Sequence, residues 1–285
     1  MGTIRTLAAV LMALSPFALG QGTYTQIDYP GGTCTAIFGI NNSGDVVGYY
    51  AANSAYHGFL LSKGSYTTID YPGAPDTYLL GINDQGQVVG EAVNPERTGT
   101  VGIVYDMATQ MFSKSGSFPN AYTVFSAINN AGAIVGAVEM AGSTNDIGFE
   151  LVDDTYSELR SPALVSVSPN AINSSGESIG NAVNSLGTGV NFLFHGDFQR
   201  SGIPNEIAYA SGINDAGAIA GYYYPNTSSC DGFLYQNGIF QPLSFPGSTD
   251  TIGRAVNNAN AMVGYFNIGS VTHGFLYIPE DGTRW

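Results

Sequence analysis

Aromatic side chains follow a glycine at three similar places in the sequence, and polar side chains come nine or ten residues later. Aromatic rings together with a few hydrogen-bonding groups form a surface on which a sugar ring can stack. We therefore expect a ligand-binding site built from Tyr49, Tyr50, His57, Tyr222, Tyr223, Tyr224, Asp231, Tyr265 and His273. Because successive residues of a strand point to opposite faces, half of these side chains would instead fill the core.

Signatures of catalysis and metal binding are sparse. The sequence has neither a Gly-x-Ser-x-Gly nor a His-Glu-x-x-His motif, and a zinc site needs three or four converging ligands that its three histidines do not supply. We expect no catalytic residue, no metal and no cofactor. A pair of carboxylates leaves no sequence motif, so one alternative is a hydrolase or lyase that acts on extracellular polysaccharide through Glu139 or Glu177.

The two cysteines, Cys34 and Cys230, would lie in an oxidising compartment if the chain is exported. The repeat described below puts both on the same face of the molecule, but one repeat separates them. A disulfide needs Cα atoms within about 7 Å. The sequence therefore allows this disulfide and favours two free thiols.

A ten-residue pattern, first seen at Gly39–Gly48, occurs six times in all, at intervals of 41 to 46 residues. Its central asparagines are Asn41, Asn83, Asn129, Asn173, Asn214 and Asn257. A second recurring group is glycine followed by phenylalanine and leucine, as at Gly58–Leu60. Asparagine near glycine is typical of hairpin turns, so we expect each central asparagine to cap its own hairpin. In the alternative, the six amides converge on an ion or ligand.

Each repeat of about 43 residues predicts four short strands. The first ends at the central asparagine, the second carries Val-Val-Gly, the third carries Gly-Phe-Leu, and the fourth resembles Tyr66–Asp70. The chain after residue 20 begins with a fourth strand, Tyr24–Asp28, and ends after a third, Gly274–Tyr277. We therefore predict an all-β, six-bladed β-propeller, a single domain over residues 21–285 whose ring is closed by the N-terminal strand.

One glycine and one large apolar residue recur on neighbouring strands of each repeat. The glycine of the second strand, such as Gly48, would leave a gap in the sheet surface. The residue of the third strand, such as Phe59, would lie across this gap and bury a large apolar area.

These units resemble the bacterial extracellular repeat family called HAF, after its His-Ala-Phe-type motif. The resemblance rests on the Gly-Ile-Asn-x-x-Gly-x-Val-Val-Gly, His-Gly-Phe-Leu and Ile-Asp-Tyr-Pro-Gly segments and spans Thr23 to Tyr277. It implies an exported repeat protein and no particular activity. Only His57 and His273 retain the family's histidine, so a complete ring of histidines is excluded.

The composition excludes several classes of partner. Eight Lys and Arg against 22 Asp and Glu give a net charge of −14, which provides no positive surface for nucleic acid or an anionic membrane. The 44% of hydrophobic residues suffices for a core. With 38 glycines, 18 tyrosines and 15 phenylalanines, the composition favours β-strands joined by many turns.

Residues 1–20 have the features of a signal peptide. One positive side chain, Arg5, precedes an apolar stretch too short to span a bilayer, and Ala18–Gly20 offers small residues before a predicted cut at Gln21. No second long apolar stretch follows, so we expect no membrane insertion. The chain would be secreted or periplasmic after removal of this segment.

Together these observations predict a secreted, monomeric binding module without enzymatic activity. Its expected partner is a glycan, held by the aromatic residues of repeats 5, 6 and 1. The alternatives are the polysaccharide hydrolase or lyase and a structural or adhesive surface protein that contacts another protein.

Overall fold

The computed structural model describes residues 22–116, 121–204 and 208–280, and within these ranges the chain forms 24 β-strands and no helix. No described segment therefore forms an apolar helix of membrane-spanning length. The prediction of an all-β chain is confirmed. The predicted signal peptide, residues 1–20, lies outside the described residues.

The strands form four-stranded antiparallel units, numbered here in chain order. Unit 1 contains β2 (Cys34–Ile40), β3 (Val46–Ala52), β4 (Ala55–Ser62) and β5 (Ser65–Ile69). Unit 2 contains β6 (Thr77–Ile82), β7 (Gln87–Val93), β8 (Thr100–Asp106) and β9 (Met111–Gly116). Unit 3 contains β10 (Ala121–Ile128), β11 (Ile134–Met140), β12 (Asp146–Val152) and β13 (Thr155–Glu158).

Units 4 to 6 repeat this arrangement. Unit 4 contains β14 (Leu164–Ile172), β15 (Ser178–Asn184), β16 (Gly189–Phe194) and β17 (Phe198–Arg200). Unit 5 contains β18 (Ala208–Ile213), β19 (Ile219–Tyr223), β20 (Asp231–Gln236) and β21 (Ile239–Leu243). Unit 6 contains β22 (Asp250–Val256), β23 (Met262–Ile268), β24 (Val271–Ile278) and, from the other end of the chain, β1 (Thr23–Ile27).

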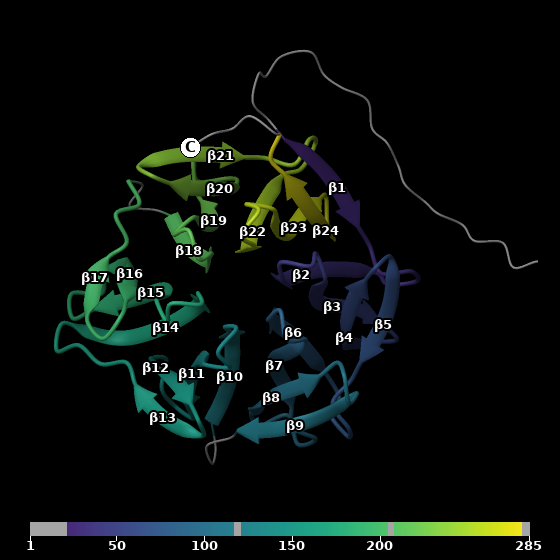
Figure 1. Cartoon of the computed structure of the whole chain (residues 1–285), viewed down its shortest axis with the longest axis horizontal. Coiled ribbons are helices and arrows are strands. Elements are labelled where there is room, and N and C mark those ends of the chain that lie inside the picture. Colours follow the sequence, from purple (N-terminus) through teal and green to yellow (C-terminus); the bar gives the residue numbers. More distant parts are fainter. Residues whose placement is uncertain (1–21, 117–120, 205–207, 281–285) are drawn as a thin grey trace, which may run out of the picture.

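The two ends of the described chain meet in unit 6. Strand β1 runs antiparallel to β24, from Thr23 opposite Ile278 to Ile27 opposite Gly274. The N-terminal strand thus completes the last sheet, as the phase of the repeat predicts. The first strand of each unit also contacts the first strands of both neighbouring units, β2 with β22 included. The units consequently surround one axis (Figure 1). A single parallel residue pair, Tyr122 with Thr100, links units 2 and 3.

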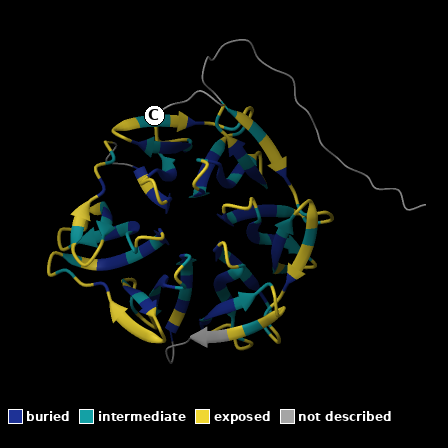
Figure 2. Cartoon of the chain, viewed as in Figure 1, coloured by how far each residue is buried: buried dark blue, intermediate teal, exposed yellow. Residues whose placement is uncertain are grey.

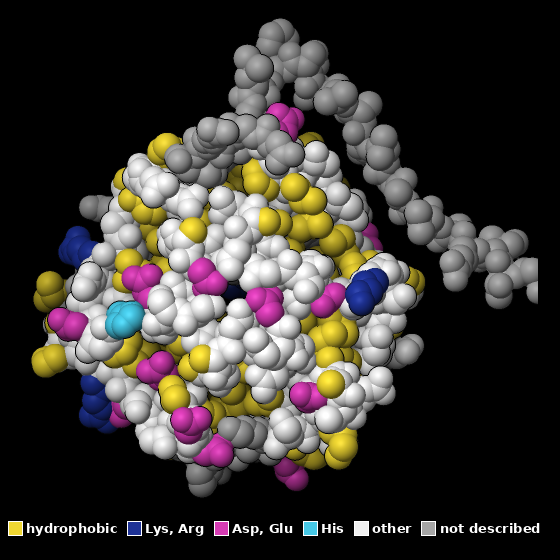
Figure 3. Space-filling view, viewed as in Figure 1, with side chains coloured by type: hydrophobic (Ala, Val, Ile, Leu, Met, Phe, Trp, Pro, Cys, Tyr) yellow, Lys and Arg dark blue, Asp and Glu magenta, His cyan; other side chains and the backbone are white. Residues whose placement is uncertain are grey.

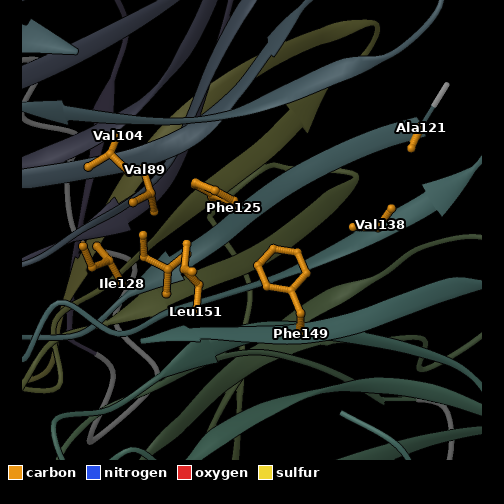
Figure 4. Packing of buried hydrophobic residues seen from close by; sticks show 9 residues of the cluster. Val89, Val104, Ala121, Phe125, Ile128, Val138, Phe149 and Leu151 are labelled. Atoms are coloured by element: carbon orange, nitrogen blue, oxygen red, sulfur yellow. The ribbon is translucent and has the colours of Figure 1, made fainter. Parts of the chain in front are cut away.

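Apolar side chains fill the space between neighbouring sheets, and the fourth strand of each unit is the most exposed of its strands (Figure 2). Between units 2 and 3, Val89 and Val104 pack with Phe125 and Phe149 in one buried cluster (Figure 4). The glycine of the third strand, which has no side chain, leaves room for a side chain of the next unit to pack against the sheet. At Gly102, an added Cβ would lie 2.5 Å from the Phe125 ring.

A β-bulge interrupts the first strand of every unit just before its small residue and leaves one residue there without a cross-strand partner; β14 has a second irregularity at Val165. The bulged residues are Phe38, Leu80, Ser126, Asn170, Ser211 and Arg254. Beside each bulge, the glycine of the second strand pairs with the predicted large residue of the third, as Gly48 does with Phe59. The structure adds a stronger reason for this glycine. A Cβ at Gly48 would lie 2.0 Å from the carbonyl oxygen of Ala36.

Candidate ligand-binding site

The aromatic residues that follow the second-strand glycine divide between two faces, as strand alternation requires. Tyr50 is buried and stacks on Tyr29, with ring centroids 3.6 Å apart. Tyr223 occupies the equivalent place in unit 5, where its ring lies edge-on to Phe240. Both tyrosines were predicted to bind ligand. The structure places them among packed rings between sheets instead.

Across neighbouring strands, His57 lies opposite Tyr50, Asp231 opposite Tyr223, and His273 opposite the buried Phe266. His57 pairs across the strands with Tyr50, and its Nδ1 lies 2.8 Å from a carboxylate oxygen of Asp70. The Nδ1 atom of His273 lies 3.0 Å from Asp28. Asp231 accepts a hydrogen bond from Ser244.

These three polar residues therefore connect the third strand of their unit to the end of the fourth strand. Each lies on the same face of its sheet as the packed aromatic residue, because directly paired residues share a face. The structure thus places these three residues beside the packed aromatic residues, on the opposite face of their sheets from Tyr49, Tyr222 and Tyr265.

Tyr49, Tyr222, Tyr224 and Tyr265 belong to two groups of rings, one in unit 5 and one that extends from unit 6 through unit 1 to unit 2. Tyr222 stacks on Tyr209 with centroids 5.0 Å apart, and Tyr224 lies edge-on to both. In unit 1, the bulged Phe38 bridges two units, since its ring lies 5.9 Å from that of Tyr265 and 5.4 Å from that of Tyr49.

In the direction of unit 2, Tyr49 makes edge-on contacts with Tyr56 and with Tyr78 of β6, at 5.5 and 5.0 Å. We call the complete set the aromatic wall. It consists of Phe38, Tyr49, Tyr56, Tyr78, Tyr209, Tyr222, Tyr224 and Tyr265.

Arg254 joins the two parts of this wall. Its guanidinium carbon lies 4.6 Å from the centroid of Phe38, 5.4 Å from that of Tyr265 and 6.0 Å from that of Tyr222. These distances are typical of cation–π contacts. One guanidinium nitrogen, Nη2, donates a 3.2 Å hydrogen bond to the hydroxyl of Tyr265.

The wall is partly accessible, and burial keeps the hydroxyl groups of two of its tyrosines protonated. Tyr56, Tyr209 and Tyr224 are each about 40% exposed. Burial raises the pKa of Tyr49 and of Tyr222 to about 12, so both phenols stay neutral over the physiological range. Such groups offer a ligand an apolar ring face together with a hydrogen-bond donor.

Sequence reasoning missed Phe38, Tyr56, Tyr78, Tyr209 and Arg254. Aligning the repeats would have shown that Phe38 and Arg254 occupy one position, the residue that precedes the small residue of the Ile-Asn group. That position is the bulge of the first strand, which lies beside the axis. In units 3, 4 and 5 this position holds small polar residues, so the aromatic wall extends around only one side of the axis.

The six repeated asparagines hold the first strands together around the axis. In unit 3, the Asn129 side-chain oxygen accepts hydrogen bonds from the backbone N–H groups of Ala131 and Ala133. Its amide donates a 3.0 Å bond to the carbonyl of Asn173 in the next unit. The prediction that the asparagines cap their own hairpins is confirmed. Because their amides are also engaged between units, they are not arranged as ligands for a bound ion.

Beside these asparagines, Asp84 and Asp215 line a narrow polar cavity of about 70 Å³ on the axis. Asp84 accepts hydrogen bonds from the backbone and side chain of Asn42 and from the amide of Asn130. In the described part of the chain, no three residues among His, Cys, Asp and Glu come together as a metal site would require. Figure 3 shows acidic side chains distributed around the centre of one face.

A larger cavity of about 350 Å³ lies between units 3 and 4. Its charged residues include Asp146, Glu158 and Arg160, and the last two are paired at 2.5 Å. Aliphatic side chains such as Leu164 and Val165 complete the lining, and no aromatic ring contributes to it. This cavity therefore lacks the stacking surface that the aromatic wall provides.

Cys34 and Cys230 are both free thiols. The Cys230 thiol is buried and donates to a carboxylate oxygen of Asp250 at 3.6 Å. Burial, followed by the charges of Asp250 and Asp231, raises the pKa of this thiol to about 12.

Comparison with known proteins supports the architecture. No protein-family model matches the sequence, and no curated protein matches it significantly. Among solved structures, the β-propeller domain of the Trilobed protease from Pyrococcus furiosus, described as having an open velcro topology, is similar with a TM-score of 0.57 and 12% identity. The match covers 88% of this chain and 81% of that one.

Two lectins are similar to the same degree. The SapL1 lectin, solved in complex with alpha methyl fucoside, has a TM-score of 0.55 at 11% identity, over 87% of this chain and 96% of that one. The Aleuria aurantia lectin, described as a six-bladed β-propeller with a novel fucose recognition mode, has a TM-score of 0.53 at 10% identity, over 90% and 99% of the two chains. At such low identity these matches establish only the fold class, which is a β-propeller.

Proposed function

We propose that this chain is an exported six-bladed β-propeller of the HAF-repeat type, closed by the pairing of β1 with β24, which binds carbohydrate on the aromatic wall. The closure rests on the antiparallel register from Thr23 to Ile27. The binding function rests mainly on one observation, the two groups of aromatic rings, eight rings in all, that Arg254 joins.

A wall of this kind suits a sugar ring because its C–H groups can stack on an aromatic face while its hydroxyl groups find donors and acceptors at the edges. The exposed tyrosines, Tyr56, Tyr209 and Tyr224, are where such stacking would begin. Two lectins with bound or recognised fucose share the fold class, so the scaffold is compatible with a glycan-binding protein.

Binding is favoured over hydrolysis by the bulged residues of the first strands. Hydrolysis of a glycosidic bond uses two carboxyl groups on either side of the scissile bond. No carboxylate occupies any of the six bulged positions. Glu177 lies instead in a hairpin turn, where one of its oxygens accepts a hydrogen bond from Asn173.

A glycan array probed with residues 21–285 tests this proposal. The variant Tyr49→Ala/Tyr222→Ala/Tyr265→Ala should lose the glycans that the unchanged protein binds, because truncating a central aromatic contact costs about 2 kcal/mol or more, roughly 30-fold in Kd. The control is Tyr156→Ala on β13, which removes a more exposed tyrosine from the outer strand of unit 3. Circular dichroism melting shows whether each variant is folded.

Loss of binding in the triple variant but not in the control would support the aromatic wall as the site. Unchanged binding in a folded triple variant would show that the site lies elsewhere. If the unchanged protein binds no glycan at all, the carbohydrate proposal is overturned.

A further inference from the structure

Arg254 is the one cation among the bulged residues, and its surroundings leave its charge uncompensated. Its Nε atom is buried and has no hydrogen-bond partner. Within residues 22–116, 121–204 and 208–280 it forms no ion pair, whereas the more exposed Arg97 and Arg160 each have a carboxylate partner within 2.7 Å. An arginine is always protonated, and partial burial of its charge without a counter-ion is costly.

The lack of a carboxylate beside Arg254 is notable in so acidic a chain. Acidic residues outnumber basic ones by 22 to 8, so a partner carboxylate would be easy to supply from the chain itself. Arg254 is surrounded by Phe38, Tyr222 and Tyr265 instead. The geometry therefore combines a positive charge with three neighbouring ring faces and leaves the anion to come from outside.

The guanidinium group recognises planar, two-oxygen anions best, because its N–H groups form a fixed fork that matches a carboxylate. Sugars that carry a carboxylate have this anion next to a ring that can stack on tyrosine. We propose that the aromatic wall binds a carboxylate-bearing saccharide, such as a uronic acid unit, with the carboxylate paired to Arg254 and the sugar ring stacked on the neighbouring tyrosines. This inference rests on the proposed carbohydrate-binding function and specifies the class of sugar.

The alternative role for Arg254 is structural, in which it only holds Phe38 and Tyr265 together through its ring contacts and the hydrogen bond to the Tyr265 hydroxyl. The two roles differ in what they require of the ligand. A structural arginine gives no preference for an anionic sugar, whereas a recognition arginine discriminates between an acid and its neutral ester.

The test is an array that displays carboxylated glycans beside the methyl ester of each, followed by calorimetric titration of the best pair. We expect the acid to bind at least 10-fold more tightly than its ester. Arg254→Gln should remove this preference, so that acid and ester bind the variant with the same affinity. Arg254→Lys should retain part of it, because lysine keeps the charge but lacks the planar fork. Thermal melting of each variant shows whether it is folded.

Equal affinity for acid and ester in the unchanged protein overturns the proposal without any variant, and so does a preference for sulfated over carboxylated glycans. An acid preference that persists in folded Arg254→Gln also overturns it. If acid and ester bind equally and the triple tyrosine variant loses both, carbohydrate binding stands while the inference about Arg254 fails. If no glycan of either kind binds, both fail.

Discussion

The side-chain amide of Asn257 donates a 3.2 Å hydrogen bond to the backbone carbonyl of Asn41, 216 positions earlier in the sequence. The same bond, between 2.9 and 3.4 Å long, connects the equivalent asparagines at the other five junctions. Units 6 and 1 are therefore joined near the axis in the same way as neighbours in sequence. The pairing of β1 with β24 completes unit 6 at its outer edge.

Replacing one of these asparagines should weaken the whole ring. Asn129→Ala would remove two accepted hydrogen bonds and one donated bond from a buried position, which leaves backbone groups unsatisfied. With about 1 kcal/mol for each lost bond and more for each orphaned group, we expect a loss of about 2–4 kcal/mol in the free energy of unfolding. Urea-induced unfolding measures it.

The matched control is Asn145→Ala. Asn145 is exposed, and its side chain makes no hydrogen bond to any described residue. Its replacement should change the unfolding free energy by less than about 0.5 kcal/mol. Equal effects of the two substitutions would contradict a structural role for the inter-unit amide bonds.

The glycine beside each bulge should tolerate no side chain. In Gly221→Ala, the new Cβ would lie 2.1 Å from the carbonyl oxygen of Tyr209, which is backbone and cannot rotate away. We expect destabilisation of about 3 kcal/mol or more, at or beyond the upper end for overpacked sites. Gly189→Ala is the control, because nothing lies within 4 Å of its Cβ position. A thermal midpoint in Gly221→Ala as high as in the control would refute the steric argument.

The parts of the fold that repeat could be predicted from the sequence, because six copies reveal what every unit needs. The pairing of Gly48 with Phe59 and the completion of unit 6 by the N-terminal strand are of this kind. The face on which a given tyrosine lies could not be predicted, since it depends on register. A shift of one residue exchanges Tyr49 for Tyr50.

The site was harder to predict because its central residues differ from unit to unit. Phe38 and Arg254 occupy the same bulged position but share no chemistry, so comparison of the repeats shows only a variable residue there. Their importance follows from the bulge, which puts them beside the axis, and from the closed ring, which makes units 6 and 1 neighbours.

Acid should weaken the ring through the two aspartates at the axis. Burial acts to raise the pKa of Asp84 and of Asp215, but hydrogen bonds from their neighbours outweigh it and leave both pKa values below the ordinary 3.8. A carboxyl group with a lowered pKa in the folded state stabilises the protein above its unfolded-state pKa. That contribution disappears as the pH falls through the folded-state value.

The double variant Asp84→Asn/Asp215→Asn should therefore be less stable than the unchanged protein at pH 7, and the difference should shrink as the pH falls below about 4. Unfolding free energies from urea titrations between pH 7 and pH 2.5 give the comparison. Glu96→Gln, an exposed residue with no described hydrogen-bond partner, controls for the general loss of negative charge. A difference that stays constant with pH would contradict the lowered pKa values.

Cys230 should react slowly with alkylating reagents in the folded protein. Its pKa of about 12, caused first by burial and then by the nearby carboxylates of Asp250 and Asp231, leaves only about one thiol in 10,000 ionised at pH 8. In the variant Cys34→Ser, where Cys230 is the remaining cysteine, iodoacetamide should modify the folded protein far more slowly than the protein unfolded in guanidinium chloride. Asp250→Asn in that background should speed the reaction, because it removes the negative charge closest to the sulfur. A folded-state rate equal to that of the unfolded chain would mean that the thiol is exposed and that its contact with Asp250 does not hold in solution.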